Sequence, residues 1–157
     1  MTVAARLAGY GLCWPASAPH SAPEWRAAGD FRPTPMPAAD RTVRVDGYTV
    51  NLTGTLQAGR EPGLAFTVAK DGRPVTDPQP CPGGYGHLAA LRAGDLAHSH
   101  IHPQDSAGDG HSAAGPRVRF HAGLPTAAAC RLFPDFRTGD RVHPAALTSI
   151  QEGDPPS

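Results

Sequence analysis

The sequence lacks several features that would place it in a common functional class. It has no surplus of basic residues, because 14 Lys and Arg balance 14 Asp and Glu, and a nucleic-acid binder needs such a surplus to neutralise phosphates. None of its three cysteines forms a Cys-x-x-Cys pair, which argues against a zinc site built from thiolates. No apolar run approaches the roughly 20 residues of a transmembrane helix. Nucleophile-elbow, phosphate-loop and dinucleotide-binding motifs are also missing, so no common enzyme class is indicated.

The first 40 residues carry no pattern of a folded element. MTVAARLAGYGLCW begins like an export or anchor segment, but Pro15 and the polar residues after it end its apolar run early. Residues 15–40 are rich in Pro and Ala and show no helical stripe, which indicates a disordered or extended linker. We therefore expect a disordered or degraded export segment and linker over residues 1–40, a folded domain over residues 41–150, and a disordered tail over residues 151–157.

The sequence pattern of the folded region predicts short strands separated by turns. Gly and Pro, 18 of each, interrupt helices and favour turns. Apolar residues alternate in TVRVDGYTVNL, where Asp46-Gly47 suits a bulge or a tight turn, and in GLAFTVAKDGRPVT, where Asp71-Gly72 suits a hairpin turn. The pattern predicts an all-β fold, specifically an Ig-like antiparallel β-sandwich of about seven strands, with a β-barrel as the alternative.

Histidines gather in the second half of this region. Seven of the eight follow residue 86, and AHSHIHP places three of them at alternate positions. A hairpin turning around Ala93-Gly94 would put His87 opposite His100. Because strand side chains alternate between faces, His87, His98, His100 and His102 would then share one face. The other face, which we expect to pack in the core, would carry Leu88, Ala90, Ala97, Ser99 and Ile101.

Four imidazoles on one hairpin face predict a transition-metal site. Side chains two apart on a strand lie roughly 6.5–7 Å apart, and opposed Cβ atoms lie about 4.5–5.5 Å apart, so two imidazoles can share one ion. His87, His100 and either His98 or His102 would supply three nitrogens, which suit Cu(II), Zn(II) or Ni(II) better than Ca²⁺ or Mg²⁺. Further residues could approach from other segments: His121 and His143 from predicted strands, His111 from a loop, and Asp95 and Asp105 as acids that orient an imidazole.

Other interpretations of the same residues stay open. Adjacent imidazoles also suit a pH-responsive surface, and alternating polar residues are typical of any solvated sheet face. Gly94, His100 and His102 match the opening Gly-x5-His-x-His of a cupin, but the Glu expected after the second histidine is absent. A disulfide between Cys81 and Cys130 is a further alternative, although spacing alone does not show that two cysteines meet.

Four stretches of the chain resemble a family of actinobacterial heavy-metal-associated or membrane-anchored secreted proteins. They are GGYGHLAALRAGDLAHSHIHP, KDGRPVTDPQP before it, and RLFPDF and RVHPAALT after it. The likeness covers residues 44–149. It implies an Ig-like β-sandwich exported behind one N-terminal transmembrane segment, hence an extracytoplasmic location, with a role in metal handling. The positions that match are His87, His100 and His102, with His143 a weaker match.

The chain departs from that family in several places. The apolar anchor is interrupted, so an altered reading frame or a degraded copy is our hypothesis for residues 13–30. His98 stands where an aromatic residue is usual, and Cys81, Cys130 and Pro134 stand where apolar or aromatic residues are expected. From residues and resemblance together we expect a non-enzymatic domain that binds copper or zinc, with a metal-handling or membrane protein as partner. A structural or protein-interaction Ig-like module with incidental histidines is the alternative.

Overall fold

The computed structural model describes residues 34–60, 62–81, 84–109, 111, 114–124 and 127–150, and these form twelve β-strands and no helix. The all-β prediction is therefore confirmed, although the described residues form twelve strands rather than about seven. The expectations for residues 1–33 and 151–157 lie outside the described residues. Within the described part, no helix is long and apolar enough to span a membrane. The strands are β1 Thr42–Val45, β2 Tyr48–Gly54, β3 Gln57–Ala58, β4 Gly63–Lys70, β5 Arg73–Pro74, β6 His87–Arg92, β7 His98–Pro103, β8 Arg117–His121, β9 Gly123–Leu124, β10 Ala129–Thr138, β11 Arg141–Pro144 and β12 Leu147–Ile150.

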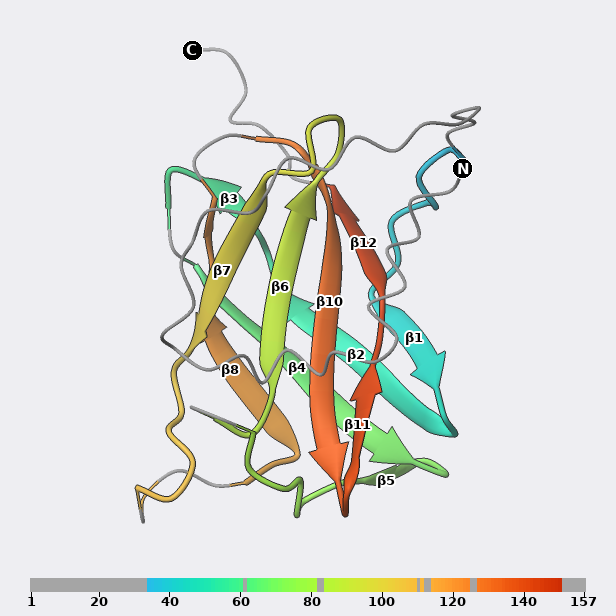
Figure 1. Ribbon diagram of the computed structural model, residues 1–157, viewed down its shortest axis with the longest axis vertical. Coiled ribbons are helices and arrows are strands. Elements are labelled where there is room, and N and C mark those ends of the chain that lie inside the picture. The colour runs from blue at the N-terminus through green and yellow to red at the C-terminus, as the bar shows by residue number, and fades with distance from the viewer. Residues whose placement is uncertain are drawn as a thin grey trace, which may run out of the picture.

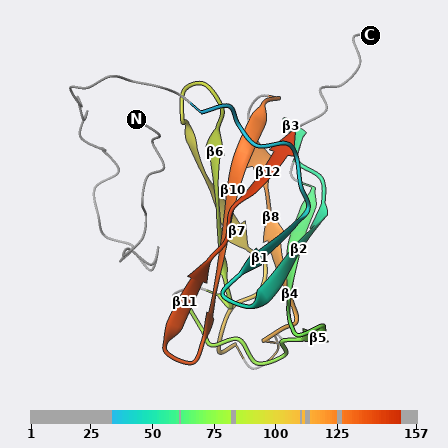
Figure 2. The same cartoon turned by 90° about the vertical axis from the view of Figure 1, so that its right-hand side faces the viewer.

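One antiparallel sheet contains ten of these strands and curls almost into a barrel. Its order is β1-β2-β4-β8-β7-β6-β10-β11, with β12 beside β10 and β5 beside β4, while β3 and β9 form a short parallel ladder. Figures 1 and 2 show two facing layers, one with β6, β7, β10, β11 and β12 and the other with β1, β2, β4 and β8. The layers resemble the predicted sandwich, but they are continuous through the β7–β8 pairing, so the architecture is barrel-like.

The core lies between the two layers and follows from the alternating pattern of the strands. Phe66 on β4 and Phe120 on β8 are fully buried, and their rings stack with centroids 5.5 Å apart. Leu88 on β6 and Ile101 on β7 are cross-strand partners and are also buried. Burial of such large apolar side chains contributes roughly 1.5–3 kcal/mol each, so these strands have a strong preference for the face they present inward.

Two tight turns occupy the positions predicted from Asp-Gly pairs. Asp46 and Gly47 have φ of 50° and 82°, and they join β1 to β2. Asp71 and Gly72 have φ of 50° and 75°, and they join β4 to β5. Positive φ at both central residues is the type I′ conformation, whose twist matches that of the flanking strands.

Pro134 lies in a strand that is paired on both sides. β10 pairs with β6 on one side, and on the other side with β12 over its first half and β11 over its second. Pro134 stands where the β12 pairing has ended and the β11 pairing has not begun, and its carbonyl accepts a hydrogen bond from the Ala145 amide at 2.9 Å. A residue without an N–H is tolerated at this break because no ladder bond is required from it.

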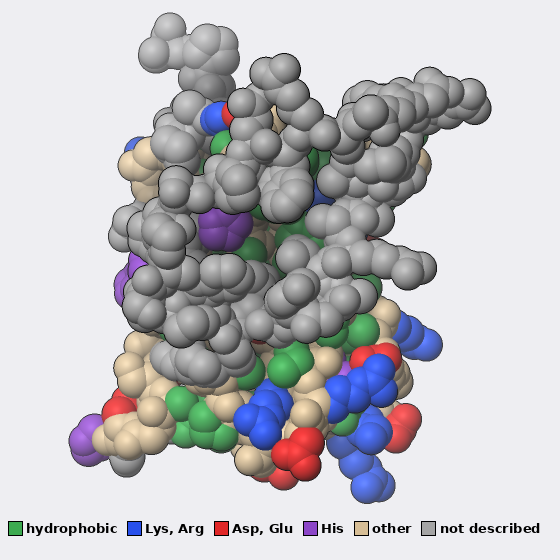
Figure 3. All heavy atoms as spheres, viewed as in Figure 1, with side chains coloured by type: hydrophobic (Ala, Val, Ile, Leu, Met, Phe, Trp, Pro, Cys, Tyr) green, Lys and Arg blue, Asp and Glu red, His purple; other side chains and the backbone are tan. Residues whose placement is uncertain are grey.

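Side chains close the seam between the two ends of the sheet. Asp46, in the β1–β2 turn, accepts a hydrogen bond from Nδ1 of His143 on β11 at 2.8 Å, and Arg141 forms an ion pair with the same oxygen at 3.1 Å. The other ring nitrogen of His143 contacts Thr138 Oγ1 at 2.8 Å, and that hydroxyl contacts the Tyr48 hydroxyl at 2.9 Å. Charged side chains gather at this lower end of the molecule (Figure 3). The seam is thus joined by a polar chain instead of a backbone ladder.

Candidate metal-binding face

The β6–β7 hairpin forms as predicted, but its register differs by two residues. The ladder pairs Ala89 with His100 and Leu91 with His98, whereas the sequence predicted His87 opposite His100. The position of the turn causes this difference. The Arg92 amide donates to the Ala97 carbonyl at 3.0 Å, so the centre of the loop lies one residue further along the chain than predicted.

Asp95 stabilises that loop. Its carboxylate accepts a hydrogen bond from the Ala97 amide at 3.1 Å and another from Nε of Arg92 at 2.9 Å. The hydrogen bond from Arg92 is the main reason that the pKa of Asp95 is well below its usual range, at about 2. Asp95 therefore serves the turn, and its carboxylate is engaged there rather than with a histidine. Sequence reasoning could not weigh these side-chain bonds against the alternative loop.

A shift of two residues leaves the alternation between the two faces of the hairpin unchanged, although Ala97, predicted for the core face, is exposed. Leu88, Ala90 and Ile101 are buried in the core, as expected. On the opposite face His98 and His102 are exposed, and His87 is half-buried. His100 occupies the ladder position opposite Ala89, but its side chain lies outside the described part of the structure. For His87, His98 and His102 the predicted grouping on one face is correct, whereas the pairing of His87 with His100 is wrong.

The observed register creates a row of polar residues across four neighbouring strands. His121 on β8 is the cross-strand partner of His102 on β7, and His87 on β6 is the partner of Asp135 on β10. His102 and His87 are each the next position beyond the last β6–β7 pair, Leu88 with Ile101. We call His121, His102, His87 and Asp135 the histidine row. The row crosses β8, β7, β6 and β10, which are neighbours in that order in the sheet.

The spacing of the row determines which members can act together. Adjacent strands lie about 4.8 Å apart, so the four positions span about 14 Å. Neighbouring members can therefore share one ion, but the two ends cannot. Among the residues whose side chains are described, no three His, Cys, Asp or Glu groups already converge as metal ligands.

Asp135 is a buried acid at the inner end of the row. It is only 6% exposed, and its Oδ1 accepts a hydrogen bond from the His87 amide at 3.1 Å. Burial raises the pKa of this carboxyl from 3.8 to about 6, against the opposing influence of the His87 imidazole and amide. Sequence reasoning missed Asp135. The signal was an acidic residue within the apolar strand RLFPDF.

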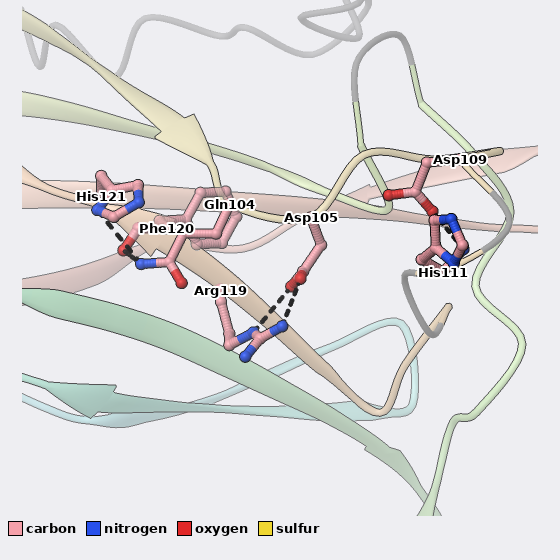
Figure 4. A network of polar contacts seen from close by, with 7 residues as sticks. All are labelled: Gln104, Asp105, Asp109, His111, Arg119, Phe120 and His121. Carbon is pink, nitrogen blue, oxygen red and sulfur yellow. Dashed lines mark hydrogen bonds and ion pairs between the residues drawn. The ribbon is translucent and has the colours of Figure 1, made fainter.

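The outer end of the row is held by Gln104. Its Nε2 lies 3.4 Å from Nδ1 of His121 and donates to the Phe120 carbonyl at 3.3 Å. This contact orients the imidazole from one side and leaves Nε2 of His121 as the nitrogen directed elsewhere. Figure 4 shows the arrangement, with His111 well away from His121 on the far side of Asp105.

The remaining candidate residues lie outside the row. Asp105 is buried and forms a bidentate pair with Arg119 at 2.6 and 3.1 Å, so its carboxylate is engaged with that guanidinium. His143 is the ladder partner of Phe136 and points into the core, on the opposite side of the sheet from the row. Cys81 and Cys130 are both buried and are not joined by a disulfide.

The comparisons with known proteins concern the family of the domain. Residues 42–152 match a family described as a domain of unknown function (DUF8832). Neither the curated proteins nor the solved structures contain a significant match to the chain. The matched range covers every described strand, from β1 to β12. The chain therefore belongs to the DUF8832 family.

Proposed function

We propose that this domain binds a transition metal, Cu(II) or Zn(II), through the histidine row and acts in metal handling. The observation that carries the proposal is the direct cross-strand pairing of His102 and His121, both exposed on the same face. Opposed Cβ atoms in such a pair lie about 4.5–5.5 Å apart, a distance at which two imidazoles can bind one ion. His87 follows on the next strand and offers a third nitrogen.

The chemistry of the row favours these ions. Neutral imidazole is the usual protein ligand for Cu(II) and Zn(II), and two or three of them leave coordination positions open for water or for a ligand from another protein. His98 and His100 precede His102 at alternate positions of β7, so they extend the supply of imidazoles along the same strand. An exposed, incompletely coordinated ion suits transfer to a metal-handling or membrane partner. The family resemblance implies an extracytoplasmic setting for it.

Calorimetric titration with Cu(II) and Zn(II) tests the proposal on chelator-treated protein. The parent should bind at least one ion, and a His102→Ala/His121→Ala variant should lose at least about tenfold in affinity, as removal of groups that support a metal site typically does. His111→Ala is the matched control, because His111 is exposed but lies outside the row. A parent that binds neither ion would favour the alternative, a structural or protein-interaction module with incidental histidines.

A second double variant locates the site along β7. His98→Ala/His100→Ala should retain most of the affinity if the cross-strand pair is the principal site. Equal losses in both double variants would instead indicate a site running along the strand. An unchanged affinity in both would remove the histidine row from the proposal.

A further inference from the structure

We infer that Asp135 is an oxygen ligand of the metal, acting with His87 and His102 at the inner end of the histidine row. The inference rests on the proposed function and adds to it a carboxylate that turns an all-imidazole site into a mixed one. His87 stands between the other two residues, since Asp135 is its ladder partner on β10 and His102 lies beside it on β7.

The first support is an unsatisfied oxygen. Asp135 is more than nine-tenths buried, and its Oδ1 is occupied by the His87 amide. Among the described residues, Oδ2 receives no hydrogen bond. A buried carboxylate oxygen without a donor is costly, and the usual remedies are a paired cation or a bound metal.

The second support is that the neighbouring arginines are engaged elsewhere. Arg131 and Arg137 share the face of Asp135 on β10, because they stand four and two residues from it along the strand. Arg131 donates to the Thr148 hydroxyl at 2.7 Å. Arg137 donates to the Gly139 carbonyl at 2.9 Å and pairs with Asp140 at 3.2 Å. Neither arginine pairs with Asp135, and the charged group that does act on its carboxyl is the His87 imidazole, which is itself a member of the histidine row.

The third support is the fit of the three residues to a known ligand class. Two imidazoles and one carboxylate, with positions left open, are a usual donor set for Zn(II) and for other divalent ions of similar hardness. Three successive positions across the strands span about 10 Å, so an ion above His87 is within reach of a side chain on either side. The hydrogen bond from the His87 amide to Oδ1 already holds the Asp135 carboxylate beside His87.

The metal test compares Asp135→Asn with the parent, using Zn(II) alone and Cu(II) alone as probes in calorimetry. The amide side chain keeps an oxygen for the His87 amide and removes the charge. We expect Zn(II) affinity to fall at least tenfold and the Zn(II)-induced rise in melting temperature to disappear. Cu(II) binding at the exposed His102–His121 pair should change much less. Asp140→Asn, which alters an exposed carboxylate, is the control and should bind like the parent.

The outcomes separate this inference from the proposed function. If the parent binds no metal, both fail. If the parent binds Zn(II) and loses it in His102→Ala/His121→Ala, but Asp135→Asn binds as tightly as the parent, only the role of Asp135 is overturned. Asp135→Ala is the second variant, and it must show the same Zn(II) loss with a cooperative melting transition.

Discussion

The buried carboxyl of Asp135 predicts that the metal-free protein is destabilised by its own site. Asp135→Asn, measured in the presence of a chelator, should therefore be more stable than the parent at neutral pH. The folded pKa of about 6, against 3.8 for the free side chain, corresponds to about 3 kcal/mol of lost stability once the group ionises, since one pKa unit equals about 1.4 kcal/mol.

The asparagine recovers most of that amount. The NH₂ group of the asparagine takes the place of Oδ2, and it finds no hydrogen-bond acceptor among the described residues. This unsatisfied donor lowers the stability of the variant by about 1 kcal/mol. The net gain in the free energy of unfolding should therefore be about 2 kcal/mol at pH 7.5.

The direction with pH follows from proton binding. Between pH 4 and 6 the folded parent binds more protons than the unfolded chain, so its stability decreases as the pH rises through this window and is level above it. Asp135→Asn lacks this group and should not share the decrease. At pH 4 the advantage of the variant should vanish or reverse by about 1 kcal/mol, the cost of the unsatisfied amide.

Guanidinium unfolding at pH 4, 5, 6 and 7.5, with chelator throughout, measures both stabilities. Adding Zn(II) at pH 7.5 should raise the stability of the parent and leave that of the variant nearly unchanged, because a ligand stabilises only the state that binds it. A variant less stable than the parent at pH 7.5 without metal would refute the reasoning. That result would mean that the ionised carboxylate is stabilised in the metal-free fold.

Two further predictions concern the seam and one turn. The hydrogen bond from His143 holds the pKa of Asp46 below its usual value. The ionised Asp46 therefore stabilises the fold at pH values above the usual pKa, and this stabilisation is lost as the pH falls through the lowered pKa. Asp46→Asn should remove this part of the acid unfolding profile followed by circular dichroism, and superimposable profiles of variant and parent would contradict the prediction. Gly54 has a φ of 95°, and a Cβ there would lie 2.3 Å from the Gly63 carbonyl oxygen, whereas Gly47 has a φ of 82° with open space around it. In urea unfolding Gly47→Ala should cost about 1–2 kcal/mol for the left-handed backbone alone, and Gly54→Ala should cost clearly more; equal losses would show that the clash relaxes freely.

The local features of the fold were predictable because their causes are local. Asp46-Gly47 and Asp71-Gly72 favour turns through their own backbone preferences, and both turns are present. The register of the β6–β7 hairpin was not predictable, because Asp95 selects among loops through side-chain bonds to Arg92 and Ala97. Hydrophobic alternation tolerates a shift of two residues, since such a shift leaves each side chain on the same face.

By itself the sequence determined the β character of the domain, the places of two turns and the face that His87, His98 and His102 share, since each depends on near neighbours in the chain. Only the tertiary structure decided which residues stand beside them. His121 and Asp135 join the row because β8 pairs with β7 and β10 pairs with β6, connections between segments that are distant in sequence. Side-chain alternation is a property of one strand, whereas a row across strands depends on strand order and register, and these are set by the packing of the whole sheet.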